Sequence, residues 1–194
     1  IADHKVMVAP TLVILEAIYL RDQPEVHGNP DAAYMPRRLR EAWEVNREKY
    51  NTEPRAALDV RRKQVQKYKE LTGILYRAGV TLLAGTDAPE PDVPPGFSMH
   101  RELELLVESG LPPAAALQCA TINNAVAVNQ GDQLGSVDVG KIADLAILSA
   151  DPTADIRNTR KIDYVIRGGR VIEPLQILAS YEDGAGGAAT GLVP

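Results

Sequence analysis

The segment "VTLLAGTDAPE", residues 80–90, decides the fold, because five mostly apolar residues run directly into a glycine, a threonine and an acid. An uninterrupted apolar run of this length is typical of a strand buried on both faces, as in a parallel sheet. Asp87 ends the run, and a proline follows two residues later. The acid fits two interpretations: a structural cap of the next turn, or a catalytic group at the end of a strand.

The residues before this strand predict a helix and a second strand. Apolar side chains in residues 55–78 recur at spacings of three, four and seven, which indicates an amphipathic helix. Gly79 suits the left-handed position just after a helix end. Further upstream, "KVMVAPTLVIL" at residues 5–15 predicts another buried strand with Pro10 near its end. Strand, helix and strand form the crossover unit of a parallel sheet, so the predicted class is α/β.

Residues 21–54 are rich in proline, glycine, asparagine and charge. They predict a long loop that holds a short helix at about residues 38–50. Long ordered loops at strand ends are often lids or binding loops. The basic side chains at 61–69 alternate with apolar residues at helical spacing, which favours a solvated helix face.

The C-terminal third changes from helical to strand periodicity. A helix is expected over residues 99–109 with Ser98 as its N-cap, and a further helix within residues 110–128 opens with Pro113 in its first turn. After residue 129 short strands follow, one at 142–148 and two joined by Gly168 and Gly169, a pair typical of a two-residue hairpin turn. The expected domains are residues 1–130, residues 131–174 and a flexible Gly/Ala-rich tail at 175–194.

Composition excludes several classes. The net charge of -5 argues against a nucleic-acid partner, which normally requires a basic face. Cys119 is the single cysteine, so no internal disulfide framework or CxxC zinc site is present, and a buried apolar role is expected for it. No apolar run approaches the roughly 18 residues that span a bilayer, so no membrane partner is expected. A Rossmann-like or flavodoxin-like nucleotide binder is disfavoured because neither strand leads into a glycine-rich turn.

Four segments then occur in one order and spacing: "GVTLLAGTDA", "GFSMHRELELLVESGLPPAAALQCATINNAV", "LGSVDVGKIADLAIL" and "VIRGGRVI". Together they resemble the C-terminal part of the metal-dependent amidohydrolase superfamily over about residues 6–172. The similarity is greatest to the imidazolonepropionase-like branch, which includes Xaa-Pro dipeptidase-like enzymes. The resemblance implies an α/β fold: the C-terminal part of a (β/α)8 TIM barrel plus a small β-sandwich element. Residues 5–15 would be the seventh barrel strand and residues 80–87 the eighth.

The resemblance also implies the site. Asp87 occupies the position of the family's acid that binds a divalent metal, expected to be zinc, and takes a proton from the attacking water. The physical chemistry agrees, because a residue at the C-terminal end of a barrel strand faces the active-site mouth. A carboxylate beside a zinc-bound water can accept its proton. His100, on the loop-to-helix junction that follows, is the candidate for substrate binding, whereas His4 and His27 have no metal-ligand partner at suitable spacing.

The sequence departs from the family in its histidines. Among the three histidines no His-x-His occurs, and a catalytic zinc normally takes about three protein ligands. A barrel of this type takes about 250 residues, so the chain is expected to be the C-terminal portion of a larger enzyme. A homo-oligomer is the expected assembly of that enzyme. One hypothesis is a hydrolase of amide or cyclic amide bonds in dipeptides or small cyclic amides, with substrate loops at 21–54 and 89–100. The other is an inactive fragment or barrel-completing module that binds the missing N-terminal barrel portion or a complementary chain.

Overall fold

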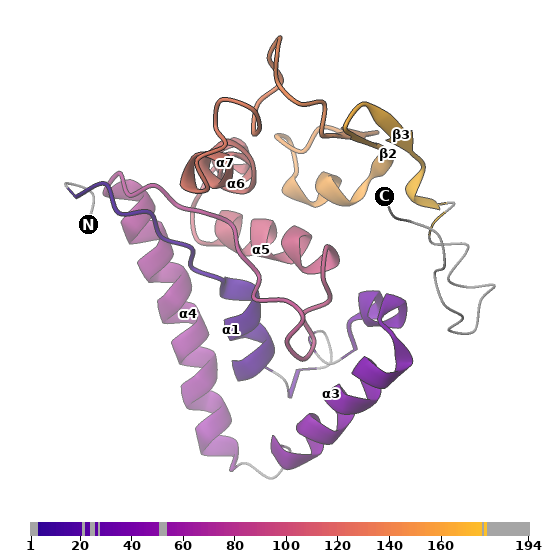
Figure 1. Cartoon of the computed structure of the whole chain (residues 1–194). Coiled ribbons are helices and arrows are strands. Elements are labelled where there is room, and N and C mark those ends of the chain that lie inside the picture. The colour runs from indigo at the N-terminus through magenta and orange to yellow at the C-terminus, as the bar shows by residue number, and fades with distance from the viewer. Residues whose placement is uncertain are drawn as a thin grey trace.

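A computed structural model describes residues 4–20, 22–23, 26, 28–50, 54–175 and 177. The side chains of residues 46–50 and of residue 55 are outside the description. The elements in chain order are the helices and strands α1 (Leu12–Tyr19), η2 (Pro30–Tyr34), α3 (Arg37–Tyr50), α4 (Arg55–Arg77), α5 (Phe97–Glu108), α6 (Pro113–Ala120), α7 (Ile122–Ala127), β1 (Leu145–Leu148), η3 (Ile156–Arg160), β2 (Ile162–Arg167) and β3 (Arg170–Ile172), where η denotes a 3-10 helix. Helix α1 packs against both α4 and α5, and the sheet lies on the far side of α5 (Figure 1).

The two segments predicted as strands lie side by side and run parallel, but they pair through one isolated bridge and neither forms a strand. Val8 and Leu82 form a parallel bridge, in which Val8 N donates to Thr81 O at 3.0 Å and Leu83 N donates to Val8 O at 2.9 Å. Val80, Leu82 and Ala84 are buried. The side chains of Asn123 and Asn124 in α7 donate hydrogen bonds to the backbone oxygens of Leu82 and Ala84, at 2.9 Å each. These amides therefore satisfy backbone oxygens that a further strand would otherwise have to pair.

The prediction of one strand over residues 5–15 was wrong in its second half. Thr11 adopts a left-handed conformation (φ 46°), and helix α1 begins at Leu12. The apolar residues at 12–14 are buried as a helix against α4 and α5. A short apolar run is compatible with either a buried helix or a buried strand, and here the tertiary contacts decide for the helix.

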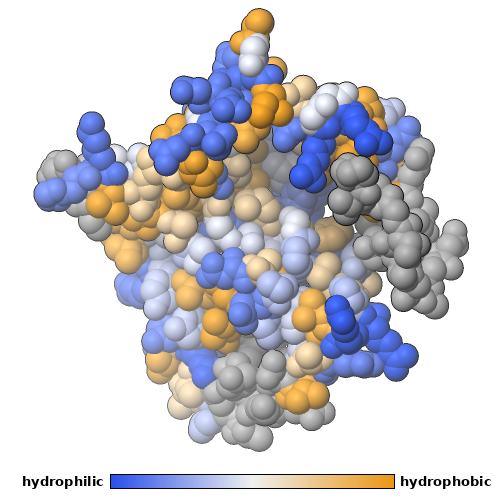
Figure 2. All heavy atoms as spheres, in the orientation of Figure 1, coloured by the Kyte–Doolittle hydropathy of each residue, from blue (hydrophilic) through white to orange (hydrophobic). Residues whose placement is uncertain are grey.

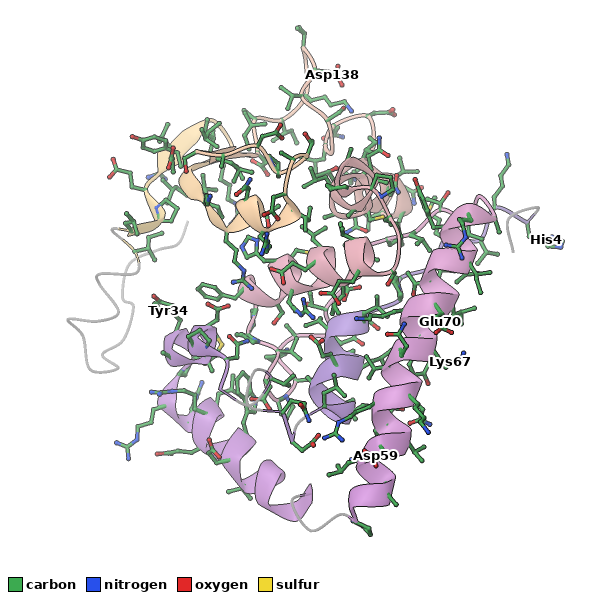
Figure 3. All side chains as sticks on the ribbon, turned by 180° about the vertical axis from the view of Figure 1, so that it is seen from behind. His4, Tyr34, Asp59, Lys67, Glu70 and Asp138 are labelled. Carbon is green, nitrogen blue, oxygen red and sulfur yellow. The ribbon has the colours of Figure 1, made fainter. Side chains whose placement is uncertain are left out.

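Helices α3 and α4 confirm the predictions made for them. Gly79 follows α4 with φ 78°, the left-handed conformation expected of it. Gly73, inside α4, allows a close approach to the end of α5, because a Cβ at this position would lie 2.1 Å from the backbone oxygen of Ser109. The solvated basic face predicted for α4 is confirmed in part: Lys67 pairs with Glu70 at 2.7 Å on the helix surface (Figure 3), whereas Arg61 and Lys69 are partly buried.

Helix α5 starts earlier than predicted. Its first residue is Phe97, and Gly96, with φ 81°, occupies the cap position that the sequence assigned to Ser98. Ser98 lies inside the first turn and is 3% exposed. The helix predicted within residues 110–128 is divided into α6 and α7 at Thr121, whose φ and ψ of -119° and -97° are not helical.

Strands β1, β2 and β3 form one antiparallel sheet in sequence order. Val165 pairs with Ile172 across the hairpin, and Gly168 and Gly169 both have positive φ, which confirms the two-residue turn. Strand β1 begins at Leu145, later than the predicted residue 142. The proposed tail at 175–194 lies outside the described residues except for 175 and 177.

The core gathers side chains from α1, the 80–84 segment, α5 and α6. Figure 2 shows apolar surface where the upper end of α4 approaches α6 and α7. Exposed apolar side chains of these helices are Leu71, Ile74 and Val126. Within the described residues, no helix combines the length and the apolar character needed to cross a membrane.

Candidate active site

Asp87 lies in the turn that ends the 80–84 segment. Its φ is 54°, a left-handed value that few residues other than glycine adopt, and its side chain is exposed. The turn is closed by local hydrogen bonds, from Ala88 N to Thr86 Oγ1 at 3.4 Å and from Glu90 N to Asp87 O at 3.4 Å. The carboxylate is therefore presented to solvent from a backbone conformation that the surrounding structure holds in place.

The Asp87 turn lies beside the end of the first extended segment. A Cβ at Gly85 would meet Thr11 Cγ2 at 3.1 Å and Ala9 Cβ at 3.7 Å. Glycine at position 85 thus permits the two segments to approach closely at their carboxyl ends. These are the ends at which ligands bind in parallel α/β folds.

Glu102 is a buried acid that the sequence analysis missed. Its residue is 0% exposed, and its Oε2 accepts a hydrogen bond from Val13 N at 2.8 Å. Thr11 provides no side-chain cap for α1, so a carboxylate 89 positions along the chain supplies the acceptor that an N-cap residue would normally supply. A partial signal existed, because Glu102 stands three and four positions before Leu105 and Leu106 on the core-facing side of α5.

The environment of Glu102 favours its protonated form. Burial raises the pKa of Glu102 to about 7, although hydrogen bonds from Val13 and Leu12 act in the opposite direction. The negative charges of Glu16 and Asp87 raise the pKa further. Its second oxygen, Oε1, is buried and has no hydrogen-bond partner among the described residues. Glu102 is therefore an acid that changes charge near neutral pH, within the electrostatic influence of Asp87.

His100 faces a different element. Its Nδ1 lies 3.0 Å from Thr159 Oγ1, and the Thr159 hydroxyl itself donates to Ile156 O at 2.9 Å. Nδ1 is consequently the donor in the contact with Thr159, which leaves Nε2 as the acceptor nitrogen of a neutral ring. Burial lowers the pKa of His100, and the positive charge of Arg160 lowers it further. The partner of His100 thus lies on η3 and not on the turn that carries Asp87; its predicted substrate contact stays a prediction.

Among the described residues, no group of three or more histidine, cysteine, aspartate or glutamate side chains is placed to hold a metal ion. His4 is exposed, and His27 lies outside the described residues. Cys119 is buried, as predicted, and burial raises the pKa of its thiol to about 11, which disfavours the thiolate that binds metals. The described residues offer Asp87 as a single carboxylate and do not fit a complete catalytic metal site, which takes about three protein ligands.

A network of charges joins the helices around this site. Arg101 donates to both carboxylate oxygens of Glu16 at 2.8 Å, and also to Glu104 at 2.9 Å and Glu108 at 2.7 Å. Burial would lower the pKa of Arg101, but the hydrogen bonds to these carboxylates raise it above its ordinary value. Lys69 of α4 extends the network to Glu108 at 2.6 Å. The network fixes α1, α4 and α5 relative to one another.

Comparison with protein families and curated proteins gives a consistent result. The sequence model described as "Amidohydrolase family" matches residues 34–172. An imidazolonepropionase of Herpetosiphon aurantiacus is 40% identical over 109 residues, which cover 54% of this chain and 25% of that protein. An imidazolonepropionase of a Geobacillus species is 33% identical over 99 residues, covering 49% of this chain and 23% of that protein. The matched region corresponds to about a quarter of the length of these relatives.

Solved structures agree. A Xaa-Pro dipeptidase with methionine bound in its active site is 29% identical, with a TM-score of 0.54, over 70% of this chain and 33% of that one. Molinate hydrolase is 30% identical, with a TM-score of 0.54, over 66% of this chain and 31% of that one. A bottromycin amidohydrolase reaches a TM-score of 0.69 over 88% of this chain and 38% of that one. Its 23% identity indicates a shared fold alone.

Proposed function

This chain belongs to the amidohydrolase family, in the branch of imidazolonepropionase-like and Xaa-Pro dipeptidase-like proteins, and we propose that it is the C-terminal part of a metal-dependent enzyme that hydrolyses amide or cyclic amide bonds. The substrates proposed are dipeptides, especially those with C-terminal proline, and small cyclic amides. The proposed fold of the whole enzyme is a (β/α)8 barrel, to which this chain contributes the last two strands. The three-stranded sheet would belong to a small β-sandwich.

The position of Asp87 is the single observation that carries this proposal. Asp87 follows the second of two parallel extended segments, and its exposed carboxylate stands where their carboxyl ends meet. In a barrel this end forms the active-site mouth. We assign Asp87 the role of proton acceptor for the attacking water and of one ligand to the metal.

Zinc is the metal proposed, and when bound it would bring the pKa of a water molecule close to neutrality. Its other ligands would have to come from residues that the described part of this chain does not supply. His100 is proposed as a substrate contact. Since Nδ1 is held by Thr159, such a contact would use Nε2 as a hydrogen-bond acceptor.

A second candidate is that this polypeptide by itself is inactive and completes a barrel with a complementary chain. The small number of histidines and the absence of His-x-His favour this alternative for the isolated chain. The two candidates concern different objects, the whole enzyme and the isolated chain. In the whole enzyme, a homo-oligomer is the assembly proposed.

Asp87→Asn in the full-length enzyme tests the proposed role. We expect hydrolysis of a Xaa-Pro dipeptide to slow by at least about 100-fold, because a positioned proton acceptor contributes roughly 10²–10⁴-fold. Asp163→Asn, an equivalent change of an exposed acid on β2, serves as the control and should leave kcat unaltered. Hydrolysis by Asp87→Asn at the wild-type rate would contradict the role.

Metal analysis of the isolated chain separates the two candidates. The barrel-completing alternative requires that the chain alone, dialysed against zinc, retains much less than one equivalent. Stoichiometric zinc on this chain alone would remove that alternative and would show that its residues suffice for a metal site.

A further inference from the structure

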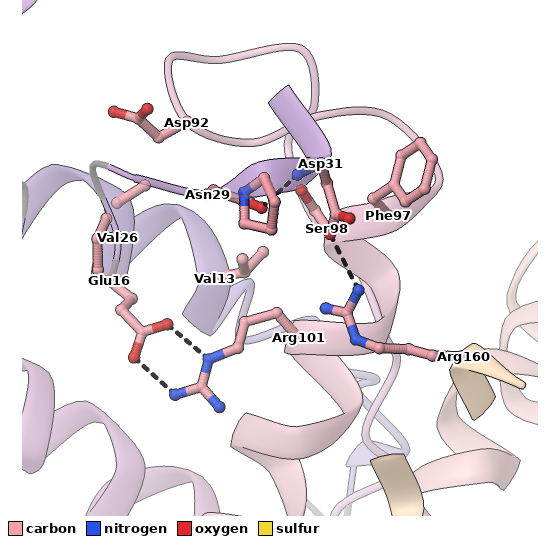
Figure 4. Close-up of a pocket in the computed structure, with 12 residues that line it drawn as sticks. Val13, Glu16, Val26, Asn29, Asp31, Asp92, Phe97, Ser98, Arg101 and Arg160 are labelled. Atoms are coloured by element: carbon pink, nitrogen blue, oxygen red, sulfur yellow. Dashed lines mark hydrogen bonds and ion pairs between the residues drawn. The ribbon is translucent and has the colours of Figure 1, made fainter. Parts of the chain in front are cut away.

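A cavity of about 310 Å³ lies between α1, the first turn of α5 and the end of η3 (Figure 4). The residues that line it come from both segments expected to be substrate loops, at 26–31 and at 92–98. Neither Asp87 nor His100 is among them. The volume is at the lower end of the range of ligand pockets, about 300–1,000 Å³, and suits a small molecule.

One part of the wall is apolar. It is formed by Val13, Ala17, Val26, Pro30 and Phe97. Phe97 is held in place by stacking on Tyr34 at a ring-centroid distance of 5.0 Å. This surface can receive an aliphatic group of a ligand and remove it from water.

Ser98 supplies a polar group without a partner. The residue is 3% exposed, it lines the cavity, and its Oγ makes no hydrogen bond with the described residues. A buried hydroxyl that forms no hydrogen bond costs free energy, so such groups are normally paired. A ligand in the cavity would provide the missing partner.

Arg160 stands on the same side as Ser98. It donates from one terminal nitrogen to Asp31 Oδ2 at 2.9 Å, and its Nε lies 3.5 Å from Glu104 Oε1. A guanidinium has five N–H donors, so donors on the second terminal nitrogen remain for a ligand. Arginine and a hydroxyl at one end of a cavity form a recognition pair for a carboxylate.

The opposite side carries an acid. Figure 4 shows Glu16 across the cavity from Ser98 and Arg160, whereas the carboxylate of Asp92 points away from the cavity. Asp31, which pairs with Arg160, is a second acid in the lining. Glu16 is bound to Arg101, but each carboxylate oxygen can accept more than one hydrogen bond. A ligand with a carboxylate alone would bring a negative charge toward these acids, and an amine alone would leave Ser98 and Arg160 without a partner.

We propose that this cavity binds a small zwitterion of the amino-acid type. Arg160 and the Ser98 hydroxyl hold its carboxylate, Glu16 faces its ammonium group, and its side chain lies on the apolar wall. The proposal does not rest on Asp87 or on any metal, because it concerns binding at residues that the proposed chemistry does not use.

Calorimetric titration of this chain tests the proposal with three probes that share one aliphatic body. They are L-leucine, 4-methylpentanoic acid, which lacks the amino group, and 3-methylbutylamine, which lacks the carboxyl group. L-Leucine should bind at least about 10-fold more tightly than either analogue, because each analogue loses one charge-assisted interaction worth at least a factor of ten. Absence of leucine binding at millimolar concentration, or equal affinity for an analogue, would overturn the proposal.

Two variants locate the site. Ser98→Ala should weaken leucine binding by about 10-fold while leaving the unliganded chain at least as heat-stable, because it removes a hydroxyl that has no partner in the empty cavity. Arg160→Gln, which keeps the folded core intact, should weaken binding by at least as much. Ser109→Ala is the matched control: this buried serine on the C-terminal side of α5 donates to Leu105 O and does not line the cavity. Leucine affinity unchanged in Ser98→Ala and Arg160→Gln, or reduced equally in Ser109→Ala, would show that the cavity is not the site.

Discussion

The helical layer of α1, α4 and α5 and the three-stranded sheet are held together in different ways. In the layer, groups far apart in sequence meet: Glu102 caps α1 from 89 positions away, and Arg101 binds Glu16 from 85 positions away. In the sheet, the strands are neighbours in sequence, and side chains such as Tyr164 and Val171 are 44% and 65% exposed.

The difference teaches where changes in this chain will be felt. A residue of the helical layer supports several elements at once, so its loss leaves cavities or unsatisfied groups in a shared core. A residue of the sheet supports mostly its own hairpin. Helices α1 and α5 of the layer also supply part of the cavity wall, so the stability of the layer and the geometry of the cavity are linked.

The largest effect is expected from the core of the layer. Leu106 is 0% exposed, and Leu106→Ala should lower the free energy of unfolding by about 3–4 kcal/mol, through lost burial and the cavity left behind. Val171→Ala in the sheet should change it by less than about 0.5 kcal/mol. Urea denaturation of both variants measures the contrast. Equal losses would mean that the sheet shares the core of the layer.

A pH-dependent effect is expected from Glu102. Its folded-state pKa of about 7 lies above the ordinary value of a glutamate, so the folded chain keeps the proton that the unfolded chain releases. The contribution of Glu102 to stability should therefore be fully present below about pH 4.5 and be lost as pH rises to about 7, by up to about 3 kcal/mol. Glu102→Gln, which has the same shape and no charge, should flatten this slope.

Urea denaturation of wild type and Glu102→Gln at pH 5 and pH 8 measures the change. Glu90→Gln, which alters one charge in an exposed turn, controls for net charge. An identical pH slope in wild type and Glu102→Gln would show that Glu102 does not titrate in this range.

A small effect is expected at the segment before β1. Asp144 Oδ1 accepts a hydrogen bond from Gly168 N at 2.6 Å and so ties the hairpin turn to the segment before β1. Asp144→Ala should cost about 0.5–1 kcal/mol, as expected for one exposed hydrogen bond. Amide hydrogen exchange at Gly168 should become a few times faster, and Asp163→Ala is the control. Unchanged exchange would show that the contact does not hold the turn.

Local sequence patterns predicted those elements whose stabilising contacts lie close in sequence. The amphipathic spacing of residues 55–78 predicted α4, and Gly79 with its positive φ marks its end as expected. The hairpin turn at Gly168 and Gly169 was predictable for the same reason, because its positive φ angles are ones that glycine adopts without strain. The parallel pairing of the 5–9 and 80–84 regions was likewise expected from their apolar runs.

The failures occurred where distant residues decide. Nothing local to residues 5–15 distinguishes a strand from the helix that begins at Leu12, because that helix is stabilised by α4, α5 and the carboxylate of Glu102. Serine is a residue type favoured at N-caps, yet Gly96 occupies the N-cap position of α5. Ser98 lies inside the first turn, and its hydroxyl is buried beside the cavity. The contact between His100 Nδ1 and Thr159, 59 residues further along the chain, was also not expected from the sequence, and the substrate contact of His100 stays a prediction.

The sequence by itself determined the mixture of helices and strands, the helix over residues 55–78, the glycine turns and the position of Asp87 after an extended apolar segment, because each depends on the conformational preferences of neighbouring residues. The tertiary structure alone decided that Glu102 is buried as a cap, that this burial raises its pKa to about 7, and that Ser98, Arg160 and Glu16 line one cavity. These features arise from charges and hydrogen bonds between residues that only the folded chain brings together. A local sequence pattern therefore cannot predict them.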